Sequence, residues 1–372
     1  MTISRRFFLS LSTGALATGA WTAAKFARAE PNEHSIAASV RYLGKQFQEN
    51  AVNVTGCDGA TSIKLPSGDA LWLFGDTVEG PFTSIRTVDL KDKLSNTGAI
   101  VPTQDATNGI KQFHFLTQTD GRRPRQIIPF AADEDPAKQR LWPMSGACVG
   151  KHVYVFYHRI TLIDGVNIFD NFQLDGMGLA RANTDDLQFE RLKAPDGTYE
   201  LWKGSDPTYG VFVNQTADYL YLWGNLLTGM FLARTRPDEI EDLASCEYLA
   251  AAPTYSNPNV ESRWSRHFEP ATCLFDSVPN EMSAAYNPYL GKYLAIHSFL
   301  RENKIVVRTA PQLYGPWTDG QIIYRPQHIA DTDLIYAAKE HPEMAQQNGQ
   351  RIYVTFINSS TYIPELIEVA LK

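Results

Sequence analysis

The feature of this 372-residue sequence that most restricts its fold is a strand-like phrase that occurs five times. Each copy is an apolar run rich in aromatic and β-branched residues, and each follows a turn and another short strand. The copies lie at residues 69–76, 151–158, 218–225, 291–298 and 351–358. A supersecondary unit repeated at this spacing predicts a set of equivalent small sheets arranged around an axis.

Further strands extend these copies. A third strand follows every copy, and an outer strand follows the first four, at residues 112–117, 188–192, 246–250 and 321–325. Residues 35–43 form an unassigned strand that can take the missing outer place, as propellers do to remove a free sheet edge. We predict an all-β chain that forms a five-bladed β-propeller of four-stranded blades, with an N-terminal strand closing the last blade. A pair of β-sandwiches is the alternative, but it gives no reason for the repetition.

The first 29 residues have the pattern of a twin-arginine export signal. Residues 4–9 contain Arg5 and Arg6, a weakly apolar run follows, and residues 27–29 provide small side chains for cleavage. The apolar run is shorter than the ~20 residues of a membrane span, although a membrane anchor is the alternative. We predict a signal peptide at 1–29, a single catalytic propeller domain at 30–372 without a membrane span, and a periplasmic or secreted location.

Charge and cysteine content argue against two kinds of protein: nucleic-acid-binding proteins and proteins with a structural zinc site. Removing the four basic residues of the leader from the 34 Lys and Arg leaves 30 against 41 Asp and Glu, a net charge of −11. So acidic a chain is a poor partner for nucleic acid. The four cysteines lack zinc-site spacing, and both a Cys246–Cys273 disulfide and free thiols are open. No feature indicates an oligomeric state, and no cofactor is expected.

The first repeat carries an unusual pair of acids. Residues 56–77 read as a hairpin whose turn is Pro66-Ser67-Gly68, and folding about Ser67 sets Asp58 opposite Asp76. Cross-strand neighbours have Cβ atoms roughly 4.5–5.5 Å apart, so two ionised carboxylates repel there and the pKa of one rises. Such a pair costs stability, so its presence indicates that it has a function.

The other repeats are expected to bring polar groups to the same end of the axis. Folding each repeat about its turn sets the region from Trp142 to Met144 opposite His158, Asp206 beside Asn225, and Glu281 opposite His297. The mouth of the channel is therefore predicted to collect Asp58, Asp76, Asp206, Glu281, His158, His297, Asn225, Trp142 and Trp223.

Carboxylates flanked by aromatic rings are suited to acid/base cleavage of a polysaccharide. We predict Asp58, Asp76 and Glu281 as catalytic residues. The predicted substrate-binding residues are Trp142, His158, Asp206, Trp223, Asn225 and His297. Structural roles in turns, caps and packing are the alternative for each residue. A non-catalytic glycan-binding propeller is the alternative for the whole chain, and Asp58 with Asp76 could instead hold Ca²⁺.

Four segments resemble a known family: residues 56–77, 281–298, 315–324 and 339–360. They are similar to the domain-of-unknown-function family 4185, part of which is placed among the endo-D-arabinanases of glycoside hydrolase family 183. The resemblance implies a five-bladed propeller that cuts α-D-arabinofuranosyl linkages, with Asp58 and Asp76 as the catalytic pair. More distant five-bladed glycosidases use acids at places comparable to Asp58, Asp206 and Glu281. The two templates agree on Asp58 and differ about its partner.

Overall fold

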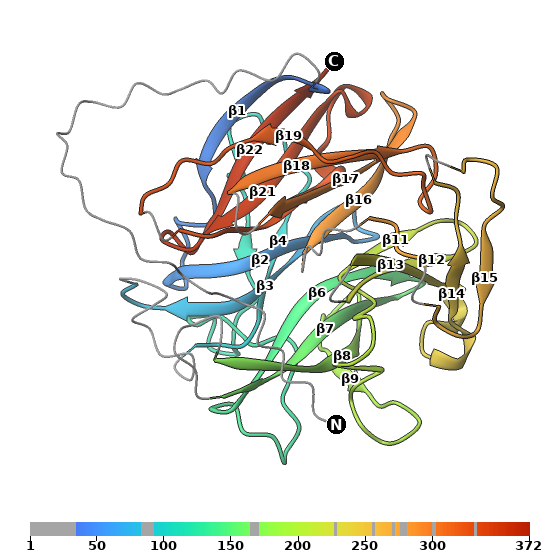
Figure 1. Cartoon of the computed structure of the whole chain (residues 1–372). Helices are drawn as coiled ribbons and strands as arrows, with labels where there is room; N and C mark the ends of the chain where they lie inside the picture. Colours follow the sequence, from blue (N-terminus) through green and yellow to red (C-terminus); the bar gives the residue numbers. More distant parts are fainter. Residues whose placement is uncertain are drawn as a thin grey trace, which may run out of the picture.

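The described part of the chain is a five-bladed β-propeller, as predicted. The computed structural model describes residues 35–82, 93–163, 171–226, 229–254, 257–269, 272–275, 281–299, 303–330 and 333–372. These residues form five antiparallel sheets arranged around a common axis (Figure 1). The predicted signal peptide at 1–29 lies outside the described residues.

Blades 1, 4 and 5 contain four strands each. Blade 1 is formed by β2 (Val54–Lys64), β3 (Ala70–Glu79), β4 (Thr97–Val101) and β5 (His114–Phe115). Blade 4 is formed by β16 (Met282–Asn287), β17 (Lys292–Phe299), β18 (Lys304–Ala310) and β19 (Gln321–Tyr324). Blade 5 is formed by β20 (Ile335–Glu340), β21 (Arg351–Asn358), β22 (Pro364–Leu371) and β1 (Ala37–Lys45).

Blades 2 and 3 contain five strands each, so the prediction of four strands per blade is wrong for these two. Blade 2 is formed by β6 (Gln139–Val149), β7 (His152–Leu162), β8 (Phe172–Asn183), β9 (Glu190–Leu192) and β10 (Trp202–Lys203). Blade 3 is formed by β11 (Phe212–Gln215), β12 (Leu220–Leu226), β13 (Gly229–Thr235), β14 (Glu247–Ala251) and β15 (Arg263–Ser265). The short strands β10 and β15 lack an alternating apolar pattern long enough to identify them.

Helical structure is minor. Within the described ranges the helices are short 3₁₀ segments: η2 (Pro237–Glu239), η3 (Leu243–Ser245), η4 (Pro342–Met344) and η5 (Gln347–Gly349). None of the helices there has the length and apolar character that a bilayer crossing needs. Cys246 is buried and is not joined to Cys273, whose thiol donates to the Phe275 carbonyl (3.0 Å).

The N-terminal strand closes the ring, which confirms that prediction. β1 pairs antiparallel with β22, from Ala37 opposite Leu371 to Lys45 opposite Glu365. It therefore forms the outer strand of blade 5, which the C-terminal segment alone does not provide (Figure 1). The closure leaves blade 5 without the exposed edge that β22 would otherwise present.

Successive blades pack through side chains of their middle strands. These strands are rich in β-branched and aromatic residues, and they are buried on both faces because each blade lies between two others. Trp72 and Trp223 are fully buried. The Trp72 ring stacks on His341 with 4.1 Å between centroids, which joins blade 1 to blade 5.

A ring of five hydrogen bonds links the inner strands around the axis. In each bond a side chain of one inner strand meets the main chain of the inner strand in the next blade. The pairs are Thr61 with Met144, Ser145 with Val213, Asn214 with Ala284, Ser283 with Glu340, and Lys339 with Gly59. The inner strands are thus held together by a closed series of contacts, and the last of them comes from a lysine.

Candidate active site

The blade 1 hairpin has the predicted register, with an irregularity at the two aspartates. Lys64 pairs with Ala70 near the turn, and Cys57 pairs with Thr77 beyond the aspartates. Between these pairs the register shifts on both sides of Gly59, which has a positive φ of 81°. Such bulges redirect side chains at functional positions. Asp58 and Asp76 consequently lie together in an irregular part of the hairpin.

Two glycines allow the acids to approach the main chain. A Cβ atom on Gly75 would lie 2.5 Å from Asp58 Oδ1, and a Cβ atom on Gly59 would lie 3.8 Å from Glu281 Oε1. Asp58 and Glu281 therefore come to the same short stretch of blade 1 from different blades. We call Asp58, Asp76 and Glu281 the acidic mouth.

Asp58 is partly exposed, and its environment favours the protonated form. The pKa of Asp58 is raised to about 7, mainly by burial and in addition by the charges of Asp76 and Glu281. A hydrogen bond from the Tyr336 hydroxyl to Asp58 Oδ2 (3.0 Å) opposes this rise, as does the charge of Lys93. A carboxyl group with this pKa can carry a proton at neutral pH.

Asp76 lies deeper than Asp58. Its side chain is 4% exposed, and its Oδ1 lies 3.3 Å from Nε of Arg140, which is 1% exposed. Burial raises the pKa of Asp76, and the positive charges of Arg140 and Lys93 only partly offset that effect. Because it is covered, Asp76 is better placed to act on Asp58 through its charge than to touch a substrate.

Glu281 is the more accessible second acid. Its side chain is 16% exposed, and its Oε1 lies 2.7 Å from Nζ of Lys339, which is 1% exposed. Lys339 also donates to the carbonyl of Gly59, the residue that follows Asp58. Asp76 and Glu281 thus each have a basic partner within the protein.

Within the described residues no group of three or more His, Cys, Asp or Glu forms a metal site.

Blade 2 contributes the predicted aromatic neighbour. Trp142 pairs directly with His158, within the region predicted to lie opposite that histidine, and a Cβ atom on Gly75 would lie 3.8 Å from Trp142 Cδ1. Trp142 is partly exposed and meets the edge of Phe172 at 5.2 Å. His158 is nearly covered, and burial lowers its pKa to about 4, so its ring is neutral at pH 7. Trp142 therefore lies beside the acidic mouth, with His158 behind it.

The blade 3 tryptophan has a structural role. Trp223 is enclosed by neighbouring side chains: its accessible fraction is 0%, and its indole N–H donates to Asn214 Oδ1 (2.8 Å). A side chain without accessible surface cannot contact a substrate, so the prediction for Trp223 is wrong.

The loop with Asp206 does lie beside Asn225, as predicted, because the Thr208 N–H donates to the Asn225 carbonyl (3.0 Å). Asp206 Oδ2 accepts from the Lys203 main-chain N–H (3.0 Å), which is the structural alternative stated for it. Asn225 is nearly buried, and its Oδ1 accepts from the Thr208 hydroxyl. Substrate binding by Asp206 and Asn225 stays a prediction.

The predicted pairing in blade 4 is wrong by one residue. Met282, not Glu281, pairs with His297, because the hairpin closes with Asn287 opposite Lys292. His297 is fully buried, stacks on Phe275 at 5.9 Å and accepts from Arg308. It cannot contact a substrate there, which overturns its predicted role. Glu281 nevertheless reaches the mouth from the residue just before β16.

Sequence reasoning missed four residues of the site: Tyr336, Lys339, Arg140 and Lys93. Tyr336 and Lys339 lie on β20, the inner strand of blade 5. A lysine inside a short apolar inner strand was the available signal, since buried lysines need a specific partner. Arg140 had no such signal, because it lies near the start of β6, directly after a long connection.

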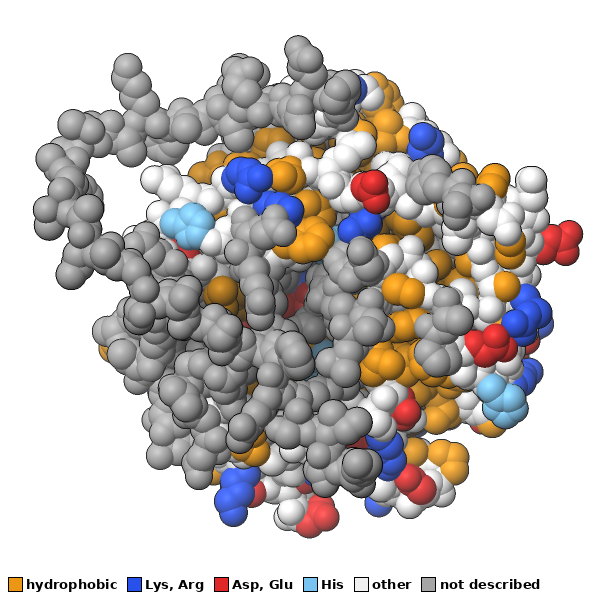
Figure 2. Space-filling view, viewed as in Figure 1, with side chains coloured by type: hydrophobic (Ala, Val, Ile, Leu, Met, Phe, Trp, Pro, Cys, Tyr) orange, Lys and Arg blue, Asp and Glu red, His pale blue; other side chains and the backbone are white. Residues whose placement is uncertain are grey.

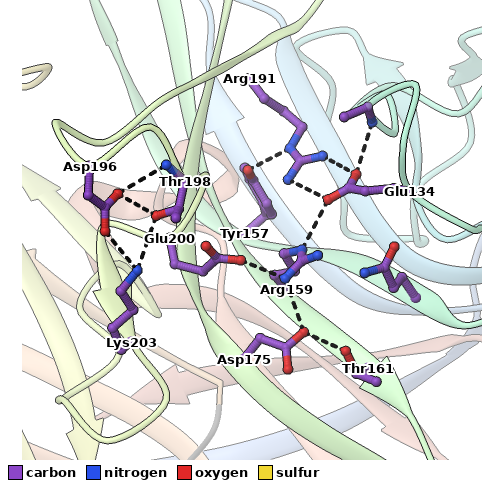
Figure 3. A network of polar contacts seen from close by, with 12 residues as sticks. Glu134, Tyr157, Arg159, Thr161, Asp175, Arg191, Asp196, Thr198, Glu200 and Lys203 are labelled. Carbon is purple, nitrogen blue, oxygen red and sulfur yellow. Dashed lines mark hydrogen bonds and ion pairs between the residues drawn. The ribbon is translucent and has the colours of Figure 1, made fainter.

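An ionic network supports the blade 2 side of the site (Figure 3). Arg159 contacts Glu200 (2.7 Å), Asp175 (3.4 Å) and Glu134 (3.0 Å). Arg191 also donates to Glu134. Glu134 belongs to the long connection before β6, so the two arginines hold that connection against the blade.

The face shown in Figure 2 has a hollow near its middle, with acidic and histidine side chains at its floor. A separate cavity of about 410 Å³ is lined by other residues, among them Pro253, Tyr314 and Trp317. None of the predicted site residues lines that cavity.

Replacing Gly75 with alanine is expected to reduce any activity of the acidic mouth by roughly 10²-fold, since displacements near 1 Å have costs of this size. The new Cβ would lie 2.5 Å from Asp58 Oδ1, so the carboxyl must move. Steady-state kinetics measures the effect. Gly320→Ala is the matched control, because its Cβ would meet nothing closer than 3.5 Å. Equal activity of the two variants would contradict the expected close approach.

The fold and its acidic mouth define the chain as a five-bladed β-propeller with a carboxylate site on its axis. It belongs to the family described as domain of unknown function (DUF4185), which it matches over residues 44–367. The family part of the predicted resemblance is thereby confirmed. No curated protein matches the sequence.

Solved structures share the fold at low identity. One is a protein from Bacteroides ovatus ATCC 8483 with a provisional hydrolase assignment: 14% identity, 87% of each chain covered, TM-score 0.59. Another is a GH43_1 enzyme from Xanthomonas citri: 15% identity, 90% of this chain and 91% of that chain covered, TM-score 0.50. At such identities the similarity establishes the propeller fold alone.

Proposed function

We propose that the chain is an exported glycoside hydrolase that cleaves a furanosidic polysaccharide, specifically an endo-D-arabinanase acting on α-D-arabinofuranosyl linkages. The observation that carries the proposal is the partly exposed Asp58, whose pKa is raised to about 7, beside a second accessible carboxylate, Glu281. Glycoside hydrolysis requires one protonated and one ionised carboxyl group. The choice of sugar is supported by the family resemblance of residues 56–77, and export by the leader pattern.

Asp58 is the proton donor in this proposal. As the bond between the anomeric carbon and the glycosidic oxygen breaks, its electron pair goes to that oxygen, which takes the Asp58 proton. Tyr336 donates to Asp58 Oδ2 and so fixes the orientation of the carboxyl group. Asp76 holds its charge behind Asp58 and raises the Asp58 pKa.

Glu281 is the ionised partner, since it is more accessible than Asp76 and has Lys339 beside it. It either accepts a proton from the water that attacks the anomeric carbon or attacks that carbon itself and forms an ester that water then hydrolyses. The anomeric configuration of the first product, read by ¹H NMR, separates these two routes. Trp142 offers a ring face to a neighbouring sugar.

Activity is expected to fall as pH rises through about 7, because Asp58 must be protonated and its pKa is raised to about 7. The profile of kcat/KM against pH measures this limb. In Asp76→Asn the limb should move to lower pH, since a charge that raises the Asp58 pKa is lost. A limb that stays in place in this variant would contradict the role given to Asp76.

The deciding assay incubates the purified protein with arabinans, arabinogalactan, fructans and xylan and separates the products by chromatography. Release of oligosaccharides from a D-arabinan, and not from the other polymers, is the expected result. Binding without cleavage would favour the alternative, a glycan-binding propeller. That alternative predicts a carboxylate occupied by main-chain hydrogen bonds, whereas the hydrogen bond to Asp58 described above comes from a tyrosine hydroxyl.

A further inference from the structure

Lys339 occupies an unusual position for a lysine. Its side chain is 1% exposed, and it reaches two acceptors that belong to different blades: Glu281 Oε1 at 2.7 Å and the Gly59 carbonyl. These acceptors are 58 and 280 residues away in sequence. A buried ammonium group is costly unless it is paired and hydrogen-bonded, so both contacts are needed to keep it there.

The two contacts join the two accessible acids of the mouth. Gly59 follows Asp58 directly, and a Cβ atom on Gly59 would lie 3.8 Å from Glu281 Oε1. Lys339 therefore connects the carboxylate of Glu281 with the main chain that carries Asp58. It is also one member of the ring of five hydrogen bonds around the axis.

Glu281 belongs to a group of interacting acids, and Lys339 is the cation beside it. Asp58 and Asp76 are both close enough to influence one another, and the Glu281 charge acts on Asp58. Like charges at this range favour protonation of one member of the group. Without the Lys339 ammonium group, more than one carboxyl group of the acidic mouth could hold the proton.

We propose that Lys339 is a positioning residue: its ammonium group pairs with Glu281 and holds that carboxylate beside Asp58, while its second contact fixes the main chain at Gly59. The inference rests on the proposed function, because it assigns the acid and its ionised partner. Lys339 acts through Glu281 and does not itself touch the reacting atoms. Its loss should therefore change the proton distribution of the mouth as well as the rate.

The test measures protonation directly and does not require activity. Carboxyl-¹³C NMR of labelled protein follows the Asp58 and Glu281 signals with pH, assigned with Asp58→Asn and Glu281→Gln. The two groups take up protons in two macroscopic steps. In Lys339→Met the lower step is expected to rise by at least about one pH unit, since removing an adjacent charge has an effect of this order. Lys203→Met is the matched control: Lys203 is 50% exposed and pairs with Asp196 at 3.0 Å.

Kinetics gives an independent readout. The acidic limb of the kcat/KM profile should move to higher pH in Lys339→Met and remain in place in Lys203→Met. The proposal would be overturned if, in folded Lys339→Met, neither the lower protonation step seen by NMR nor the acidic limb of the kcat/KM profile moves. If no polysaccharide is cleaved, the NMR titration still decides the role of Lys339, so the two proposals fail separately.

Circular dichroism shows whether Lys339→Met folds. If it does not, the double variant Lys339→Met with Glu281→Gln decides. Folding of the double variant would support the proposal, because the ammonium group would then be needed only for the Glu281 charge. Failure of both variants to fold would overturn it and leave Lys339 with a structural role at Gly59.

Discussion

Replacing Asp58 with asparagine is expected to lower hydrolysis by on the order of 10²–10⁴-fold, the usual contribution of a general acid. Asparagine keeps the shape of the side chain and can still accept from Tyr336, but it has no proton to give to the leaving oxygen. The loss should appear in kcat on the substrate that the wild-type protein cleaves. Asp120→Asn, at an exposed turn residue, is the control.

The same substitution is expected to leave the protein equally stable or more stable. The pKa of Asp58 is raised to about 7 in the folded state, against about 3.9 for an ordinary aspartate. The folded protein thus binds more protons than the unfolded chain between these values, and wild-type stability falls as pH rises from about 4 to about 7. The asparagine side chain of the variant does not titrate, so the advantage of the variant should grow across this range and then stay constant.

Thermal denaturation at pH 4 to 8 checks this expectation. A variant that is inactive and also unfolded would mean that Asp58 serves the fold. Full activity in a folded variant would remove Asp58 from the mechanism altogether.

Replacing Arg140 with methionine is expected to destabilise the protein by about 3–5 kcal/mol, the usual cost of breaking a buried ion pair from one side. Arg140 is 1% exposed, and its guanidinium lies 3.3 Å from Asp76 Oδ1. Its Nη1 also donates to the carbonyls of Pro136 (2.5 Å) and Gln139 (2.7 Å). Methionine fills similar space but leaves a buried carboxylate and two carbonyls without this donor.

The loss should increase with pH. Arg140 lowers the pKa of Asp76, so without it the folded protein holds a proton on Asp76 to higher pH and stability falls further as that proton leaves. Urea denaturation at two pH values measures the effect. Arg123→Met is the control, since Arg123 is 57% exposed and pairs with Glu79 at 2.8 Å. The Arg123→Met substitution should change the midpoint of urea denaturation little.

A double variant separates the causes. Adding Asp76→Asn to Arg140→Met removes the uncompensated charge and should restore part of the lost stability. If the double variant is no more stable than Arg140→Met, the two carbonyls, and not Asp76, account for the role of Arg140.

The architecture could be predicted because the repeat determines it. Five copies of one phrase and an unassigned first strand leave few ways to close a ring, and the blade 1 and blade 2 registers follow from short turns of recognisable chemistry. Blade 4 differs because its hairpin closes with Asn287 opposite Lys292, one residue from the assumed centre. His297 lies in the core for a different reason: β17 is a middle strand, and its residues 294–298 are buried on both faces.

The site could be predicted only where its residues are near in sequence. Asp58 and Asp76 share a hairpin, so their proximity can be deduced from turn position alone. Lys339 contacts Gly59 across 280 residues, and this proximity exists only when the ring is closed. Pairings between blades depend on how the sheets are staggered, and no local pattern encodes that.

The pairing of β1 with β22 also fixes the order in which the site can form. Of the described strands β1 is synthesised first and β22 last, and yet they pair, with Ala37 opposite Leu371. This pairing closes a loop over most of the chain, and it cannot form until β22 has been synthesised. Asp58 meets Tyr336, and Gly59 meets Lys339, only through blade 5, the blade that this pairing completes. A chain synthesised only as far as blade 4 has Asp58 and Asp76 but lacks Tyr336 and Lys339, so it carries no complete site.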